Sequence, residues 1–97
     1  MSFYPQGATI RITGNFTNAS DSAIDPATVS FGFRALNDDP TVFVYGTDEE
    51  IVKDSTGVYH VDQALPNAGR HVYRWEGASG AVFEKTIVVE KKRVTIP

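Results

Sequence analysis

The chain has 97 residues and no cysteine. A disulfide framework, a cysteine-ligated zinc site and a thiol nucleophile are therefore excluded. The chain therefore has to hold its core together by packing alone. The absence agrees with synthesis and assembly in a reducing cytosol.

Histidine is nearly as scarce, with only His60 and His71. The alternation around them places the two rings on opposite faces, which argues against a shared metal site or a Ser-His-Asp arrangement. No glycine-rich phosphate loop, zinc signature or nucleophile elbow occurs. The acidic turns at 38–39 and 48–50 lack the spacing of a calcium loop. We therefore predict no catalytic residue, no cofactor, no metal and no small-molecule substrate.

Positive charge and long apolar runs are also lacking. The net charge is −3, which gives no general attraction for nucleic acid or anionic lipid. No apolar run reaches membrane-spanning length, and residues 1–7 lack the pattern of a secretory signal. We expect neither a nucleic-acid nor a membrane partner.

The composition is that of one small globular domain. Hydrophobic residues make up 41% of the chain and aromatic residues 11%, enough for a single modest core. We expect one domain over residues 1–97, with a short N-terminal arm at 1–7 and a C-terminal tail at 91–97. The arm is read as a frayed terminus or a cap on the domain.

The most regular pattern lies in residues 54–75. Tyr59 and Val61 alternate with polar neighbours, and a Pro/Gly loop then leads to the alternating residues His71, Tyr73 and Trp75. Because successive side chains of a strand point to opposite faces, this pattern predicts two half-buried strands.

Further short strands are predicted between turn signals. Residues 8–17 and 29–35 alternate, and residues 51–53 suggest a short edge strand. The nearly continuous apolar character of residues 41–46 fits a central strand, or a strand whose outer face contacts another surface. Lys85 interrupts the apolar parity of the last strand, and a bulge near residues 84–85 would resolve the conflict.

About seven strands at 8–12-residue spacing predict an all-β sandwich of immunoglobulin-like or fibronectin type III-like type, with a small barrel as the alternative. Gly14 falls on an apolar face, where a strand glycine marks a bulge or a close backbone approach. The predicted core is Ile10, Ile12, Phe16, Val29, Phe31, Phe33, Tyr59, Val61, Tyr73, Trp75, Ile87 and Val89.

The sequence has two resemblances to known families, one at a single motif and one over most of the chain. The motif Leu65-Pro66-x-x-Gly69-x-His71-x-Tyr73 resembles the loop-and-strand corner of immunoglobulin-like domains, where a tyrosine bonds back to the backbone. Either His71 or Tyr73 occupies the position of that tyrosine. The chain as a whole resembles the small stand-alone immunoglobulin-like proteins of tailed bacteriophages. That likeness rests on GNFTN (14–18), IDPATV (24–29), VYG (44–46), VKDSTGVYH (52–60) and AGxxxYRWEG (68–77).

This resemblance implies a non-enzymatic structural protein of the virion, assembled in the host cytoplasm. It implies capsid decoration or a place at the head-tail connection or neck, with capsid, neck or tail proteins as partners and copies of the chain itself as a further candidate. The alternative is an immunoglobulin-like binding module for a host-surface or carbohydrate ligand.

The two ends carry surplus apolar or strand-forming residues, and we predict that they contact the partner. The residues concerned are Phe3, Tyr4, Lys91, Lys92, Arg93, Val94 and Ile96. Terminal strand residues add readily to a free sheet edge. The basic run at 91–93 either guards such an edge or steers docking onto an acidic surface.

Overall fold

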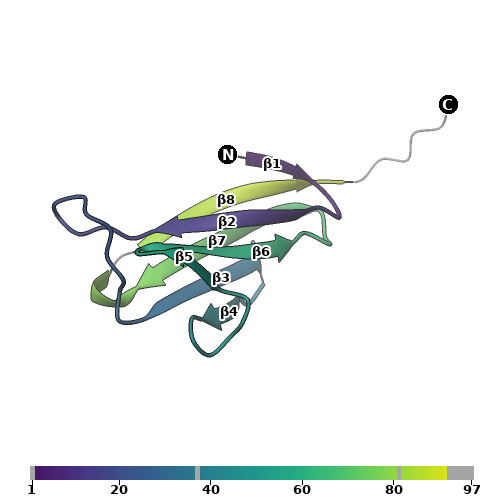
Figure 1. The fold of residues 1–97 in the computed structure, drawn as a ribbon. Helices are drawn as coiled ribbons and strands as arrows, with labels where there is room; N and C mark the ends of the chain where they lie inside the picture. The colour runs from purple at the N-terminus through teal and green to yellow at the C-terminus, as the bar shows by residue number, and fades with distance from the viewer. Residues whose placement is uncertain (1, 37, 81, 92–97) are drawn as a thin grey trace.

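The computed structural model describes residues 2–36, 38–80 and 82–91. Within them the chain forms a sandwich of two β-sheets (Figure 1). The strands are β1 (Ser2–Pro5), β2 (Thr9–Asn15), β3 (Val29–Ala35), β4 (Thr41–Val44), β5 (Val52–Ser55), β6 (Val58–Ala64), β7 (Gly69–Gly77) and β8 (Val82–Glu90), with a short 3-10 turn η1 (Ala78–Gly80) before β8. No helix among these residues is long and apolar enough to cross a membrane.

The larger sheet has the order β1-β8-β7-β3-β4 and the smaller one β2-β6-β5. Strands β2, β6 and β5 correspond to B, E and D of an immunoglobulin-like sandwich, and β3, β7 and β8 to C, F and G. The predicted all-β sandwich is therefore confirmed. The strand beyond the expected seven comes from the N-terminal segment.

The core forms between the two sheets, from the side chains that point inward from each of them. Nine of the twelve predicted core side chains are buried, and Ile10, Phe33 and Tyr73 are half-buried against them. The main cluster surrounds Trp75, which is 1% exposed. A second cluster of Leu65, Ile87 and Val89 is covered by Tyr4 from β1.

Gly14 lets the two sheets approach each other around Trp75. A Cβ at Gly14 would lie 2.7 Å from the indole ring, closer than real contacts allow. Gly14 is on the B-type strand and Trp75 on the F-type strand, the two strands that a disulfide joins in antibody domains. Here a glycine and a tryptophan make that inter-sheet contact, and the predicted close approach is confirmed.

The corner before β7 is made by His71. Its Nδ1 lies 3.2 Å from the carbonyl oxygen of Gly69, to which it donates in the tautomer with the proton on Nδ1. The ring also stacks on Phe33, with centroids 5.3 Å apart. His71 therefore bonds back to the backbone at this corner, as the corner tyrosine of immunoglobulin-like domains does.

The structure narrows two sequence alternatives and corrects one expectation. The segment 1–7 is not frayed, because β1 pairs in parallel with β8 and Tyr4 packs on the second core cluster. Residues 41–46 do not form a central strand, because β4 lies at the edge of the larger sheet. The last strand has no bulge at 84–85, because its register with β7 is continuous. Lys85 points toward the inner side of the sheet, yet it is exposed. The reason is that β1 pairs only with residues 87–90, so the sheet edge beside Lys85 is open.

Candidate functional site

The outer face of the smaller sheet carries a compact group of charged side chains. A register shift at Asp54 in β5 is a β-bulge that turns this carboxylate toward His60. His60 Nδ1 lies 2.7 Å from Asp54 Oδ2, and Arg11 donates from Nε to Asp62 Oδ1 at 2.9 Å. The hydrogen bond from Arg11 holds the pKa of Asp62 below its usual value.

This group lacks the arrangement of a catalytic centre. His60 points outward as predicted, but it is buried, and Asp54 is its only recorded hydrogen-bond partner in the described residues. A histidine–carboxylate pair needs a hydroxyl or thiol on the other ring nitrogen to act in nucleophilic catalysis. Within the same residues, no group of three His, Cys, Asp or Glu side chains is placed to hold a metal ion.

Asp25 joins the loop after β2 to the β5–β6 hairpin. Its carboxylate accepts hydrogen bonds from Lys53 Nζ at 2.7 Å, the Gly57 amide at 2.8 Å and the Tyr59 hydroxyl at 3.2 Å. The bond from Lys53, followed by that from Gly57, lowers the pKa of Asp25. Burial raises the pKa of Tyr59, and the carboxylate of Asp25 raises it further. Asp25 is thus a structural clamp.

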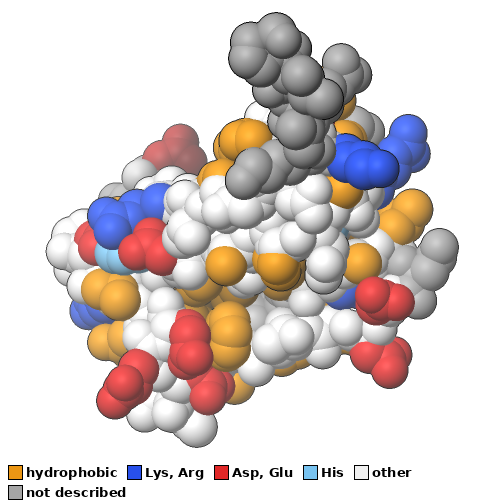
Figure 2. Space-filling model, turned by 90° about the vertical axis from the view of Figure 1, so that its right-hand side faces the viewer, with side chains coloured by type: hydrophobic (Ala, Val, Ile, Leu, Met, Phe, Trp, Pro, Cys, Tyr) orange, Lys and Arg blue, Asp and Glu red, His pale blue; other side chains and the backbone are white. Residues whose placement is uncertain are grey.

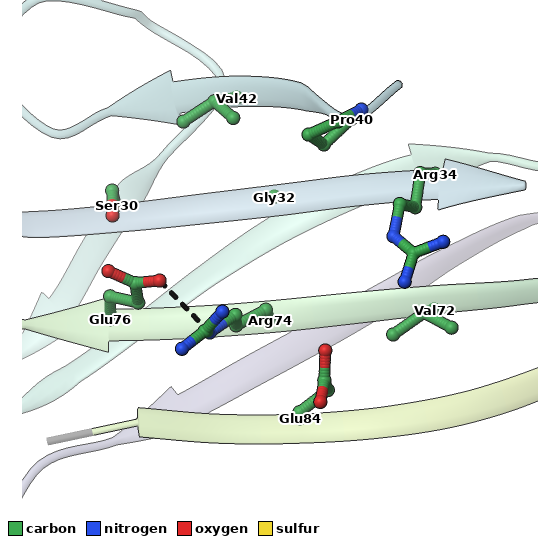
Figure 3. A pocket seen from close by; sticks show the side chains of 9 residues that line it. All are labelled: Ser30, Gly32, Arg34, Pro40, Val42, Val72, Arg74, Glu76 and Glu84. Atoms are coloured by element: carbon green, nitrogen blue, oxygen red, sulfur yellow. Dashed lines mark ion pairs between the residues drawn. The ribbon is translucent and has the colours of Figure 1, made fainter. Parts of the chain in front are cut away.

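A shallow groove of about 260 Å³ lies on the outer face of the larger sheet (Figure 3). Gly32 forms its floor, with Val42 and Pro40 on one side and β7 and β8 on the other. The full lining is Ser30, Gly32, Arg34, Pro40, Val42, Val72, Arg74, Glu76 and Glu84. None of these residues is aromatic, so the groove lacks the platform that a carbohydrate would stack on.

Most of the charged side chains around this groove have partners within the domain. Arg74 Nε lies 2.9 Å from Glu76 Oε1, and both side chains are half exposed. Arg34 donates to the carbonyl oxygen of Leu36. An exposed ion pair contributes little and is screened by salt, so the groove offers a small apolar hollow with a neutralised rim.

Large exposed apolar side chains gather instead at the sheet edges. Phe3 on β1 is 61% exposed and Val42 on β4 is 53% exposed. Those on or beside edge positions are Phe3, Val42, Val44, Tyr45, Val52, Val82 and Phe83; Ile24 and Leu36 lie in loops. Isolated proteins usually protect such edges with charge or a covering segment.

The edge of β8 is open over part of its length. Residues 87–90 pair with β1, whereas residues 82–86 are paired only with β7 among the described residues. Figure 1 shows β1 lying over only part of the length of β8. Behind this free stretch lies a hollow of about 180 Å³ between the sheets, lined by Thr13, Gly14, Asn15, Tyr73, Trp75 and Phe83.

The predicted partner-contact residues have different outcomes. Phe3 is exposed, whereas Tyr4 turns inward onto the second core cluster. Lys91 is exposed at the end of β8. Lys92, Arg93, Val94 and Ile96 lie outside the described residues. The sequence argument missed the free stretch of β8, although the misplaced charge of Lys85 was a signal of it.

The end view in Figure 2 shows charges of both signs separated by small hydrophobic patches. That face offers no broad field of one sign to a charged polymer. No protein-family model matches the chain, and no curated protein is significantly similar to it in sequence.

Proposed function

We propose that this chain is a non-enzymatic structural module that binds other proteins through its sheet edges, as a component of a tailed-phage particle. The observation that carries the proposal is the gathering of exposed apolar side chains on β1, β4, β5 and the free stretch of β8. Edge strands with apolar side chains and unpaired backbone groups are acceptors for strand addition.

The resemblance of the chain to phage immunoglobulin-like proteins supports the choice of a virion component. Capsid, neck or tail proteins are the partners that this role supplies. The shallow groove of Figure 3 favours a second candidate, a binding module for a host-surface ligand, because it is a formed hollow of about 260 Å³ on the outer face of the larger sheet. Its lack of aromatic side chains places that candidate second.

The test is the number of copies of the chain in purified particles. Phe3→Ala should reduce the copy number, because it removes an apolar side chain that is 61% exposed at a sheet edge. Leu36→Ala is the matched control, since Leu36 is 43% exposed but lies in a loop.

Removal of residues 94–97 should also reduce the copy number. Full incorporation of both the Phe3→Ala variant and the shortened chain, measured by quantitative mass spectrometry of particles, would contradict the proposal. Specific binding of the free domain to a glycan array, lost on filling the groove with Gly32→Leu, would favour the second candidate instead.

A further inference from the structure

The free stretch of β8 and the hollow behind it form a slot for one added strand. An added strand that continues the line of β1 would run parallel to β8, as β1 does. Its side chains opposite Phe83 and Lys85 would point inward, because strand partners in register share a face. Its side chain opposite Glu84 would point to solvent.

The slot has an apolar wall that the domain itself leaves open. Phe83 has inward parity, yet it is 41% exposed and contacts Phe16 at a centroid distance of 5.4 Å. Beside it lie Trp75 and Gly14 in the lining of the hollow. One or two apolar side chains from an added strand would cover this wall.

Residues 94–96 of the chain, Val-Thr-Ile, have the pattern that the slot requires. Val94 and Ile96 flank a polar residue, so a strand placing them inward places Thr95 outward. The preceding residues 91–93 are basic. On the outer face of the slot, Glu84 is exposed and carries a negative charge, whereas Glu76 beside Val82 is already paired with Arg74.

The tail cannot fill the slot of its own domain. Phe83 lies about 26 Å along β8 from Lys91, at about 3.3 Å per residue. Val94 follows Lys91 by three residues and reaches at most about 11 Å from it. In addition, β1 occupies the intervening edge. The tail of a second copy meets neither obstacle.

We propose that residues 94–96 of one copy add as a parallel strand opposite residues 83–85 of the next copy, with Val94 opposite Phe83 and Thr95 opposite Glu84. The contact is head-to-tail, so it generates a row of copies, or a closed ring where the rotation between copies allows it. Residues 91–93 then lie just before Glu84 on the outer face, and salt should weaken the association. The inference rests on the proposed use of sheet edges and names the chain itself as the partner.

Disulfide trapping tests the register directly, because the chain has no cysteine of its own. The Thr95→Cys and Glu84→Cys variants, mixed and oxidised, should form a cross-linked pair, since adjacent strands bring their Cβ atoms within disulfide range. Glu90→Cys is the matched control, because its edge is covered by Pro5. Equal cross-linking of Thr95→Cys to both sites, or to neither, would overturn the proposal.

Sedimentation velocity gives a second measurement that does not depend on a cysteine. The wild-type chain should associate with rising concentration, and the V94S/I96S double variant should associate about tenfold or more weakly because it loses two buried apolar side chains. The T95S variant should behave as the wild type. Neither change touches the described fold, so folding is not at risk.

A monomer at every concentration would overturn the inference and favour the alternative in which the inward Lys85 simply guards the edge. The copy number in particles would still test the proposed function by itself, so the two failures are distinguishable. Association that V94S/I96S leaves unchanged would place the contact on another edge and also count against the inference.

Discussion

At the scale of single residues, the contact between Gly14 and Trp75 decides how the sheets pack. The indole ring lies where a side chain of residue 14 would otherwise be. Phe16 and Phe31 pack on the same ring, with centroids 6.4 and 4.8 Å from it. The Nε1 atom of Trp75 is buried without a hydrogen-bond partner among the described residues, so the value of this residue lies in its packing.

Gly14→Ala should destabilise the domain by about 1–3 kcal/mol, the usual cost of overpacking a core. Urea unfolding followed by the fluorescence of the single tryptophan measures the change. Gly32→Ala is the control, since a Cβ there would meet only Val42 at an ordinary 3.8 Å. Equal stability of the two variants would show that the sheets separate freely at Gly14.

Trp75→Ala should cost about 3–5 kcal/mol, the range for truncating a large buried aromatic side chain. A small domain has only about 5–15 kcal/mol of stability in total, so the variant should be close to unfolding. Circular dichroism during urea titration is the suitable measurement, because the fluorophore is lost. A loss below about 1 kcal/mol would contradict the central place of Trp75 in the core.

Asp25 should make stability depend on pH in the acid range. Its pKa in the folded state is lowered, first by Lys53 and then by the Gly57 amide. The carboxylate therefore stabilises the fold above its unfolded pKa of about 3.9, and this contribution is lost as the pH falls through the lower folded value. Asp25→Asn should flatten the loss of stability below about pH 4.

An NMR titration of the Asp25 carboxyl group gives the same test without unfolding. Lys53→Met removes the largest cause and should raise the pKa of Asp25 toward its ordinary value. The side chains of both residues are more than a third exposed, so water screens the pair and the effect on stability should be modest. An unchanged titration in Lys53→Met would contradict the role of Lys53.

At the scale of elements, β1 closes one part of the larger sheet and leaves another open. It pairs with β8 from Ile87 to Glu90 and stops at Ser2. Its two aromatic residues have different environments, because Tyr4 packs on Leu65, Ile87 and Val89 while Phe3 is exposed. The same short strand therefore both stabilises the fold and leaves a large apolar side chain exposed.

Tyr4→Ala should destabilise the domain by about 1–3 kcal/mol, less than a fully buried aromatic residue would. Phe3→Ala should change stability by no more than about 0.5 kcal/mol, as is usual for exposed positions. Thermal and urea unfolding of the two variants provide the comparison. A larger loss for Phe3→Ala would show that its ring packs within the domain.

At the scale of the whole molecule, the domain is elongated, with extents of 54 × 26 × 24 Å. Its core is continuous from the Trp75 cluster to the cluster under β1, because Ile10, Phe33 and Tyr73 pack against both. The edges and the ends carry the exposed apolar side chains. This division fits the proposed module, which folds by itself and binds other proteins through its sheet edges and its ends.

Unfolding in excess chelator should match unfolding in calcium, because we expect no metal to support the fold. A ligand bound only by the folded state would raise the melting temperature by mass action. A drop of several degrees on chelation would contradict the expectation. It would indicate that the acidic turns at 38–39 or 48–50 bind a metal ion.

The alternation of side chains was enough to predict the sandwich and most of its core. Period-two patterns are local, so Tyr59, Val61 and Trp75 could be placed inward without knowing their partners. Gly14 could be singled out for the same reason, since it interrupts an apolar parity. The turn residues indicated the ends of the strands, and the same alternation indicated their outward faces.

Tertiary structure alone decided the pairing of segments distant in sequence. The register of β1 against β8, the bulge that brings Asp54 to His60 and the edge position of β4 depend on backbone hydrogen bonds that no local pattern encodes. Lys85 illustrates the limit. Its charge on an apolar parity suggested a bulge, whereas a sheet edge left open beside it gives the side chain access to water without any change of register.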